Sequence, residues 1–465
     1  MSREAAIDNA RQQFDSGAFK RALAKRIAVP TESQNPASAQ ALDDYVRKVM
    51  TPELERLGFT CEILKVEGAK GPFLIAERIE DPSLVTVLGY GHGDTVLGMK
   101  GRWIDDLDPW TLTERDGRWY GRGVVDNKGQ HSINIAALEA AMKARGGQLN
   151  FNARYLIEMG EETGSPGLAK LAQDHDDLLA ADVLIGSDGP RLHPGRPDLS
   201  LGTRGALNFD LSIEAREGGH HSGNWGGLLS DPGIELAHAI ASIAGPTGQI
   251  RIAEWVPAEL PASVRRVLKG VDPGGDPGTP DIDPNWGEAG LTPAERVFGW
   301  CSFSTLAYTC GTPDAPVNAI PPRAWARCQL RFVVGIDPDD IIPALRRHLK
   351  RHGFGKVKVE PSRESYFKAS RLDPDHPWVR FVAASVERTV GQAPTIIPNS
   401  GGSLPNDIFS ETLGLPTIWI PHSYGGCSQH APNEHVPIPL FREALQLMAG
   451  LYFDIGEGGH PGKGK

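Results

Sequence analysis

Cysteine is scarce in this sequence, with five residues in a chain of 465, and no two of them form a Cys-x-x-Cys pair. Secreted domains that depend on disulfides carry a denser and usually even set of cysteines. We therefore expect free thiols and a reducing, cytoplasmic environment. The separation of Cys301 and Cys310 leaves one disulfide open as an alternative.

Long hydrophobic runs are also missing. The longest apolar stretches, such as residues 84–90 and 417–421, have the length of a strand, and residues 1–26 mix charges without the apolar centre of a signal peptide. The sequence thus predicts neither a membrane span nor a secretory leader. Long basic runs are absent and the net charge is −10, which argues against nucleic acid or an anionic membrane as a partner.

Two common hydrolase motifs, G-x-S-x-G and H-E-x-x-H, do not occur. Their absence argues against a serine-hydrolase elbow and against the helical zinc site of many metalloproteases. Cys427 lies three residues before His430, but no strand-to-helix context there indicates an activated thiol.

Apolar strand-like runs alternate with amphipathic helices in two parts of the chain. Strands are predicted at 85–90, 152–159, 181–186, 395–398 and 416–421, and helices at 1–26, 128–145, 377–390, 404–412 and 438–455. A further helix is expected to open at Ser165-Pro166, with Ser165 as N-cap. This alternation predicts an α/β fold with a mostly parallel sheet flanked by helices.

The pattern changes in the middle of the chain. Strands at 201–215, 324–334 and 356–360 and helices at 231–243 and 337–351 surround an irregular Pro- and Gly-rich segment, 256–290. We predict one α/β domain formed by residues 1–203 and 364–456, interrupted by a smaller α+β domain at 204–363. Residues 457–465 are expected to form a disordered tail.

His92 and Asp94 follow the first of these strands and stand two residues apart. Extended backbone would place both side chains on one face. A metal-bound imidazole usually donates its other N–H to a carboxylate, so His92 is a candidate ligand and Asp94 its partner. A loop histidine beside a turn aspartate is the alternative.

Asp126 ends the segment Gly121-Arg122-Gly123-Val124-Val125-Asp126, which superficially resembles a dinucleotide-binding fingerprint. The third glycine position is Asp126, and a carboxylate there would repel a pyrophosphate. A carboxylate that bridges two cations is the functional interpretation, and a helix N-cap is the structural one.

Further acidic and imidazole side chains follow the other strands. Glu161 and Glu162 are adjacent, and in an extended chain they would point to opposite sides, so that one could bind metal while the other acts as a general base. An exposed acidic pair is the alternative. Asp188 is another carboxylate at a strand end, and His430 and His435 compete for the last ligand position.

Nitrogen and oxygen donors without a thiolate favour Zn²⁺, with Mn²⁺ or Co²⁺ as alternatives. Two adjacent cations would produce hydroxide from water at neutral pH. The sequence therefore indicates a hydrolase with two divalent metal ions.

These motifs resemble those of a family of di-metal exopeptidases, which includes aminoacylases, glutamate carboxypeptidases, carnosine dipeptidases, acetylornithine deacetylases and succinyl-diaminopimelate desuccinylases. The resemblance is carried, in the same order over nearly the whole chain, by Gly91-His92-Gly93-Asp94-Thr95-Val96, Arg122–Gly129 and Glu161–Ser165. It implies that Glu161 is the general base and that Asp126 bridges the metals. Glu162 and His430 would complete one metal site, and His92 and Asp188 the other.

The resemblance also implies that the inserted domain is a lid that often dimerises, with His221 reaching a neighbouring active site and helping to form an oxyanion hole. Substrate would be held by residues that match the lid and a glycine-rich loop, namely Asn318, Arg331, Gly401, Gly402 and Ser403. The insertion favours the carnosine-dipeptidase branch. However, Asn399-Ser400 stands where that branch tends to carry Arg-Glu.

The expected activity is hydrolysis of the amide bond of a small carboxylate-bearing substrate, such as a dipeptide. One alternative is hydrolysis of an N-acyl amino acid or of a xenobiotic C–N bond. Another, of a different class, is a metal-dependent binding protein without catalysis.

Overall fold

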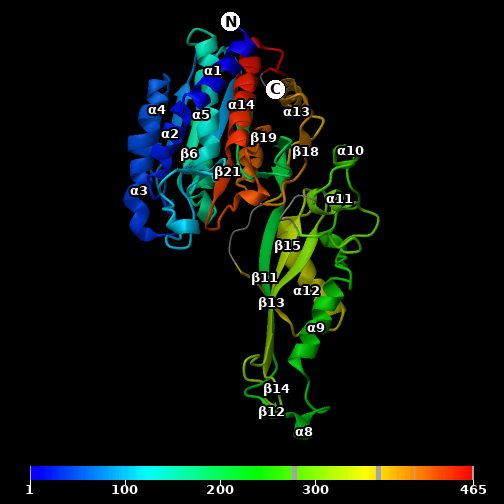
Figure 1. Ribbon diagram of the computed structural model, residues 1–465. Coiled ribbons are helices and arrows are strands. Elements are labelled where there is room, and N and C mark those ends of the chain that lie inside the picture. Colours follow the sequence, from blue (N-terminus) through cyan, green and yellow to red (C-terminus); the bar gives the residue numbers. More distant parts are fainter. Residues whose placement is uncertain (1, 275–279, 363–367, 403, 463–465) are drawn as a thin grey trace.

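The computed structural model describes residues 2–274, 280–362, 368–402 and 404–462, which form two lobes (Figure 1). The upper lobe contains both chain ends and a large sheet covered by helices. The lower lobe contains a smaller sheet that extends to a narrow tip. The domain boundaries expected at 203/204 and 363/364 stay a prediction. Residue 363 lies outside the described residues, and so do residues 463–465 of the predicted tail.

The large sheet has eight strands in the order β1-β2-β6-β3-β7-β19-β9-β18. Their bounds are β1 Thr60–Leu64, β2 Phe73–Arg78, β3 Thr86–His92, β6 Asn152–Glu158, β7 Val183–Gly186, β9 Asp198–Ser200, β18 Thr395–Ile397 and β19 Thr417–Trp419. The central run β6-β3-β7-β19 is parallel, while β1 and β2 are antiparallel at one edge. The predicted α/β fold with a mostly parallel central sheet is confirmed.

Helices cover both faces of this sheet, because successive strand residues point to opposite sides. On one side Leu74 and Val87 pack with the helices α1, α5 and α14, which contact one another (Figure 1). On the other side Ile75 and Leu88 pack against Leu168 of α6. The helices of this lobe are α1 Arg3–Asp15, α2 Ala18–Ile27, α3 Ala39–Asp44, α4 Thr51–Arg56, α5 Lys128–Ala144, α6 Leu168–Asp174, α7 Asp176–Leu179, α13 Pro377–Val390 and α14 Ile438–Glu457.

The smaller sheet is antiparallel, in the order β13-β15-β11-β16. Its strands are β11 Gly205–Glu214, β13 Ser302–Cys310, β15 Arg323–Phe332 and β16 Lys358–Pro361. Buried residues alternate along β11, which is typical of a sheet with one covered face. The helices α9 (Pro232–Ile243) and α12 (Ile341–Arg351) contribute to the same hydrophobic core as that face.

Short elements connect and extend the two sheets. At the tip of the lower lobe, β12 (His220–His221) pairs with β14 (Ala319–Ile320) beside α8 (Ser222–Trp225) (Figure 1). The remaining strands and α-helices are β4 Thr113–Arg115, β5 Arg118–Tyr120, β8 Pro190–Arg191, β10 Gly202–Thr203, β17 Ser370–Arg371, β20 Ser423–Tyr424, β21 His435–Pro437, α10 Ala262–Leu268 and α11 Pro293–Phe298.

The structure refines some of the local predictions. Ser165 does not cap a helix, because its backbone has φ +50° and its hydroxyl donates to Glu158, so that α6 begins only at Leu168. The predicted helix at 404–412 is helical from 406 to 412, and its last part, Ile408–Thr412, is a π-helix. The segment 256–290 is not wholly irregular, since it contains α10.

All five cysteines are free thiols, so the alternative disulfide between Cys301 and Cys310 is not formed. In the part of the chain that the structure describes, no helix has both the length and the apolar surface needed to cross a bilayer.

Candidate metal centre

The polar side chains of the candidate site come from one edge of the large sheet. Strand β3 ends at His92, β6 ends three residues before Glu161, and β7 ends two residues before Asp188. These strands are parallel neighbours, so their carboxyl ends meet at the same edge, where α/β proteins usually place their sites. Asp126 reaches this edge from the loop before α5, and His430 from the loop after β20.

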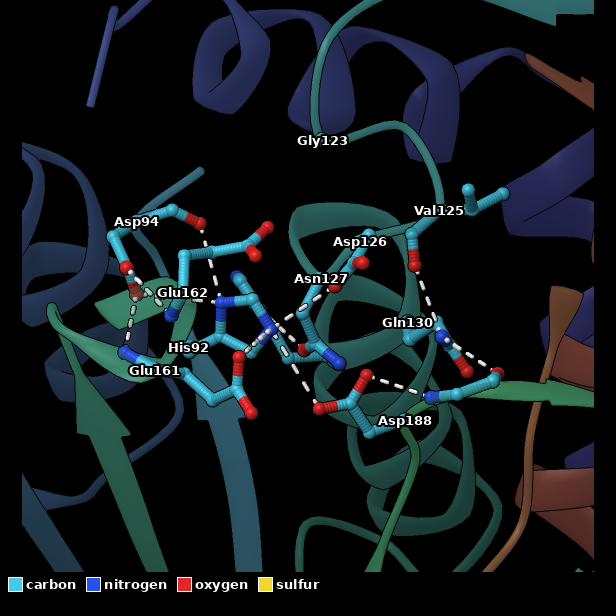
Figure 2. A network of polar contacts seen from close by, with 12 residues as sticks. His92, Asp94, Gly123, Val125, Asp126, Asn127, Gln130, Glu161, Glu162 and Asp188 are labelled. Atoms are coloured by element: carbon cyan, nitrogen blue, oxygen red, sulfur yellow. Dashed lines mark hydrogen bonds and ion pairs between the residues drawn. The ribbon is translucent and has the colours of Figure 1, made fainter. Parts of the chain in front are cut away.

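Two groups of three ligand atoms converge there and share one residue. In the first, His92 Nε2 lies 3.1 Å from Asp126 Oδ1 and 3.6 Å from Asp188 Oδ2. In the second, His430 Nε2 lies 3.0 Å from Asp126 Oδ2 and 3.0 Å from Glu162 Oε2. Within each group the ligand atoms lie within 4.8 Å of one another, so each could hold a metal ion. Figure 2 shows four of these side chains pointing toward a common space.

The burial and the hydrogen bonding of these carboxylates are consistent with a site for two cations. Burial and the neighbouring Asp126 carboxylate raise the pKa of Glu162 to about 7, and the same two causes raise the pKa of Asp188 to about 6. Among the described residues, Glu162 Oε1 and Asp188 Oδ2 have no hydrogen-bond partner although both are buried. Buried charges of one sign require compensation, and divalent cations would supply it.

Asp94 connects the histidine to the glutamate pair. Its two carboxylate oxygens accept hydrogen bonds from the backbone N–H of Glu161 and of Glu162, each at 3.2 Å, and its Oδ1 lies 3.3 Å from His92 Nδ1 (Figure 2). Both Asp94 and His92 are fully buried. Asp94 therefore orients the imidazole ring and holds the turn that carries the two glutamates.

The sequence predicted an extended backbone at Glu161 and Glu162. In the structure these residues instead begin a 3₁₀ turn, Glu161–Thr163. The side chains nevertheless diverge. Glu161 Oε2 lies 4.0 Å from His92 Nε2, whereas Glu162 faces His430. Burial raises the pKa of Glu161 well above its usual range.

Only one of the two competing histidines reaches the centre. His430 has φ +60°, an uncommon conformation that aims its ring at Asp126 and Glu162. His435 instead packs on Tyr120, with ring centroids 5.2 Å apart, and its Nδ1 lies 2.8 Å from the backbone oxygen of Asn433.

The predicted substrate-binding residues are only partly brought together. Arg331, near the end of β15, lies with Nη1 3.5 Å from the backbone oxygen of Gly401, and Gly401 and Gly402 line the cavity at the metal centre. His221 and Asn318 are exposed at the tip of the lower lobe, away from the edge of the large sheet (Figure 1). Ser403 lies outside the described residues.

A cavity of about 710 Å³ opens beside these groups. One side is formed by residues of the metal centre, among them Glu161. Much of the remaining wall consists of apolar side chains, which include Leu192, Ile397 and Leu404, with Phe298 of α11 from the inserted segment. Phe298 carries no recognisable signal in the sequence, because nothing local distinguishes a helix residue that faces a cavity from one that faces a core.

The sequence matches the model of peptidase family M20/M25/M40 over residues 88–454. This chain belongs to that family. The Beta-Ala-His dipeptidase of Rattus norvegicus is 35% identical to this M20-family chain over 83% of the chain and 80% of that protein. The cysteinylglycine-S-conjugate dipeptidase of Corynebacterium striatum is 28% identical over 77% of the chain and 78% of that protein.

Solved structures show the same fold. Human carnosine dipeptidase 1 has a TM-score of 0.74 at 23% identity and covers 98% of this chain and 99% of its own. The M20-family metallo-carboxypeptidase Sso-CP2 of Sulfolobus solfataricus has a TM-score of 0.75 at 25% identity and covers 95% and 99%. The predicted kinship with carnosine dipeptidases is confirmed, and the chain is a metal-dependent hydrolase.

Proposed function

We propose that this M20-family hydrolase cleaves the amide bond of a dipeptide or of a similarly small substrate with a carboxylate. The observation that carries the proposal is the pair of ligand groups that share Asp126, with Glu161 beside them at the cavity. Relatives named Beta-Ala-His dipeptidase and cysteinylglycine-S-conjugate dipeptidase support a substrate of this size.

In this proposal His92, Asp126 and Asp188 hold one cation, and Asp126, Glu162 and His430 hold the other. Nitrogen and oxygen donors without a thiolate fit Zn²⁺, with Mn²⁺ and Co²⁺ as alternatives. When bound, two such cations supply a hydroxide nucleophile at neutral pH and polarise the carbonyl of the scissile amide.

Glu161 is the general base. Its carboxylate takes a proton from the attacking water and returns it to the leaving amine. Burial raises the pKa of Glu161, which makes its carboxylate a stronger base than one in water. The hydrogen bond from the Glu161 backbone N–H to Asp94 keeps the turn in place while the proton moves.

Arg331 is the proposed anchor for the substrate's carboxylate. The residues before the glycine-rich loop do not offer a second anchor, since the amide of Asn399 is buried and donates to the backbone oxygens of Thr203, at 3.2 Å, and Ser370, at 3.0 Å. Asn399 thus stabilises the loop through these hydrogen bonds and is not available to bind substrate. A single guanidinium at Arg331 still offers the planar fork that matches a carboxylate.

We further propose a homodimer formed through the tip of the lower lobe, in which His221 of each subunit serves the active site of the other. The tip exposes large apolar side chains, with Val317 78%, Leu228 75% and Trp225 44% exposed. Apolar surface of this kind often marks a protein interface. A cytoplasmic location would suit the five free thiols.

The function is tested by assaying the full chain, loaded with Zn²⁺ or Mn²⁺, against dipeptides and the matching N-acetyl amino acids. We expect dipeptide hydrolysis that is lost with a chelator and restored by metal. Cleavage of N-acetyl amino acids alone would support an amidohydrolase instead. Two bound metals without turnover of either class would support the binding protein.

A further inference from the structure

Glu434 is a fully buried carboxylate that accepts four hydrogen bonds near the metal centre. One oxygen accepts from Arg122 Nη1 at 2.8 Å and from the backbone N–H of Gly123 at 2.9 Å. The other accepts from the backbone N–H of Val125 at 2.9 Å and of Asp126 at 3.1 Å. The Glu434 carboxylate therefore accepts from three of the six backbone N–H groups of loop 121–126.

Two further hydrogen bonds join the same segments. Arg122 Nη2 donates to the backbone oxygen of Ala431 at 3.0 Å, and the Gly121 N–H donates to the backbone oxygen of Glu434 at 3.2 Å. Loop 121–126 is thus fastened to loop 430–434 at several points. The first loop carries Asp126 and the second carries His430, which are two of the three members of the second ligand group.

Breaking the hydrogen bonds between Glu434 and loop 121–126 would leave buried polar groups without partners. Residues 121–126 are buried, and a buried N–H donor that loses its acceptor destabilises the folded chain. Arg122 is 1% exposed and Glu434 is 0% exposed, so neither charge has water as an alternative partner. A shift of Glu434 would release several donors and let Asp126 move relative to His430.

We propose that Glu434, together with Arg122, is a positioning residue of the metal centre, which sets the Asp126 carboxylate against the His430 ring before cations bind. This role rests on the proposed ligands but not on the identity of the substrate. Groups that orient metal ligands typically change metal affinity by about 10–100-fold when they are altered.

A purely structural ion pair is the competing explanation, because removing one partner of any buried pair destabilises a protein. Asp454 provides a matched control. It is a buried carboxylate with two arginine partners, Arg3 at 3.0 Å and Arg388 at 2.8 Å, and it lies near the end of α14 that is remote from the metal centre.

The test uses the full-length protein stripped of metal, with Glu434→Gln, Arg122→Lys and Asp454→Asn. Glutamine keeps the shape but places an NH₂ group against N–H donors. Co²⁺ and Zn²⁺ affinities are measured by competition with a chromophoric chelator, and the Co²⁺ absorption spectrum reports ligand geometry. We expect Glu434→Gln to weaken one of the two sites at least tenfold and to change the Co²⁺ spectrum, with a smaller effect for Arg122→Lys.

Asp454→Asn should lower the melting temperature without changing either metal affinity or the spectrum. Unchanged metal affinities in Glu434→Gln, or an equal loss in Asp454→Asn, would overturn the proposal. If Glu434→Gln does not fold, Arg122→Lys decides by the same measurement. If no dipeptide is hydrolysed but Glu434→Gln loses metal affinity and Asp454→Asn does not, the proposed substrate is refuted and the positioning role is supported.

Discussion

Glu161 is the residue whose proposed role separates catalysis from metal binding most clearly. Its side chain faces His92 Nε2 at 4.0 Å, but it belongs to neither group of candidate ligands. We predict that Glu161→Gln retains two metal equivalents and lowers kcat by a factor of about 10²–10⁴, the usual range for a lost general base. Metal analysis and initial rates on the same sample check this. A near-normal kcat would show that another group moves the proton.

Asp126 is the residue on which both ligand groups depend. Replacing it with alanine removes one carboxylate oxygen from each group. We predict that Asp126→Ala loses both metal equivalents after dialysis, whereas Asp188→Ala, which belongs to one group, retains one. Elemental analysis of the dialysed proteins decides between these outcomes. Two metals retained in Asp126→Ala would contradict a shared ligand.

At the scale of elements, the strand ends were predictable because apolar runs mark the buried strands β3, β6 and β7. The turn at Glu161 was not predictable, because it is fixed by Asp94, which is distant in sequence and accepts both backbone N–H groups. The start of α6 was missed for a related reason, since the Ser165 hydroxyl donates to Glu158. Strand β13 was missed because most of it is exposed and shows no alternation.

Strand β15 offers a matched pair of arginines. Arg331 lies beside Gly401, which lines the cavity, whereas Arg327 pairs with Asp210 of the neighbouring strand at 2.8 Å and its side chain is 42% exposed. We predict that Arg331→Met lowers kcat/KM for dipeptides at least about tenfold, since a charge-assisted hydrogen bond contributes about 1.5–3 kcal/mol. Arg327→Met should have little effect. Equal losses in the two variants would indicate damage to the sheet, and no loss in Arg331→Met would remove it from substrate binding.

At the scale of the whole molecule, the sequence could not show where the lower lobe places its tip. The motif around His221 predicts an active-site role, yet within one chain the tip lies away from the metal centre (Figure 1). The convergence of His430 with Asp126 also depends on long-range packing, and only the family resemblance preferred His430 over His435 beforehand. Motifs thus identify candidate residues, while their assembly requires the fold.

The proposed dimer predicts complementation between inactive variants. His221→Ala and Glu161→Gln should each be nearly inactive, and activity should return when the two are mixed and allowed to exchange subunits. A hybrid dimer then has one site with both an intact Glu161 and an intact His221. Continued inactivity, while native mass spectrometry of differently tagged variants shows that hybrids have formed, would mean that His221 does not act across subunits.

The central claim is that two divalent cations share Asp126 at the edge of the large sheet. A crystal structure of the Zn²⁺-loaded protein, with anomalous data collected at the zinc edge, tests it directly. The account predicts two anomalous peaks on either side of Asp126, one contacting His92 and Asp188 and the other contacting Glu162 and His430. A single peak, or peaks that contact other residues, would contradict it.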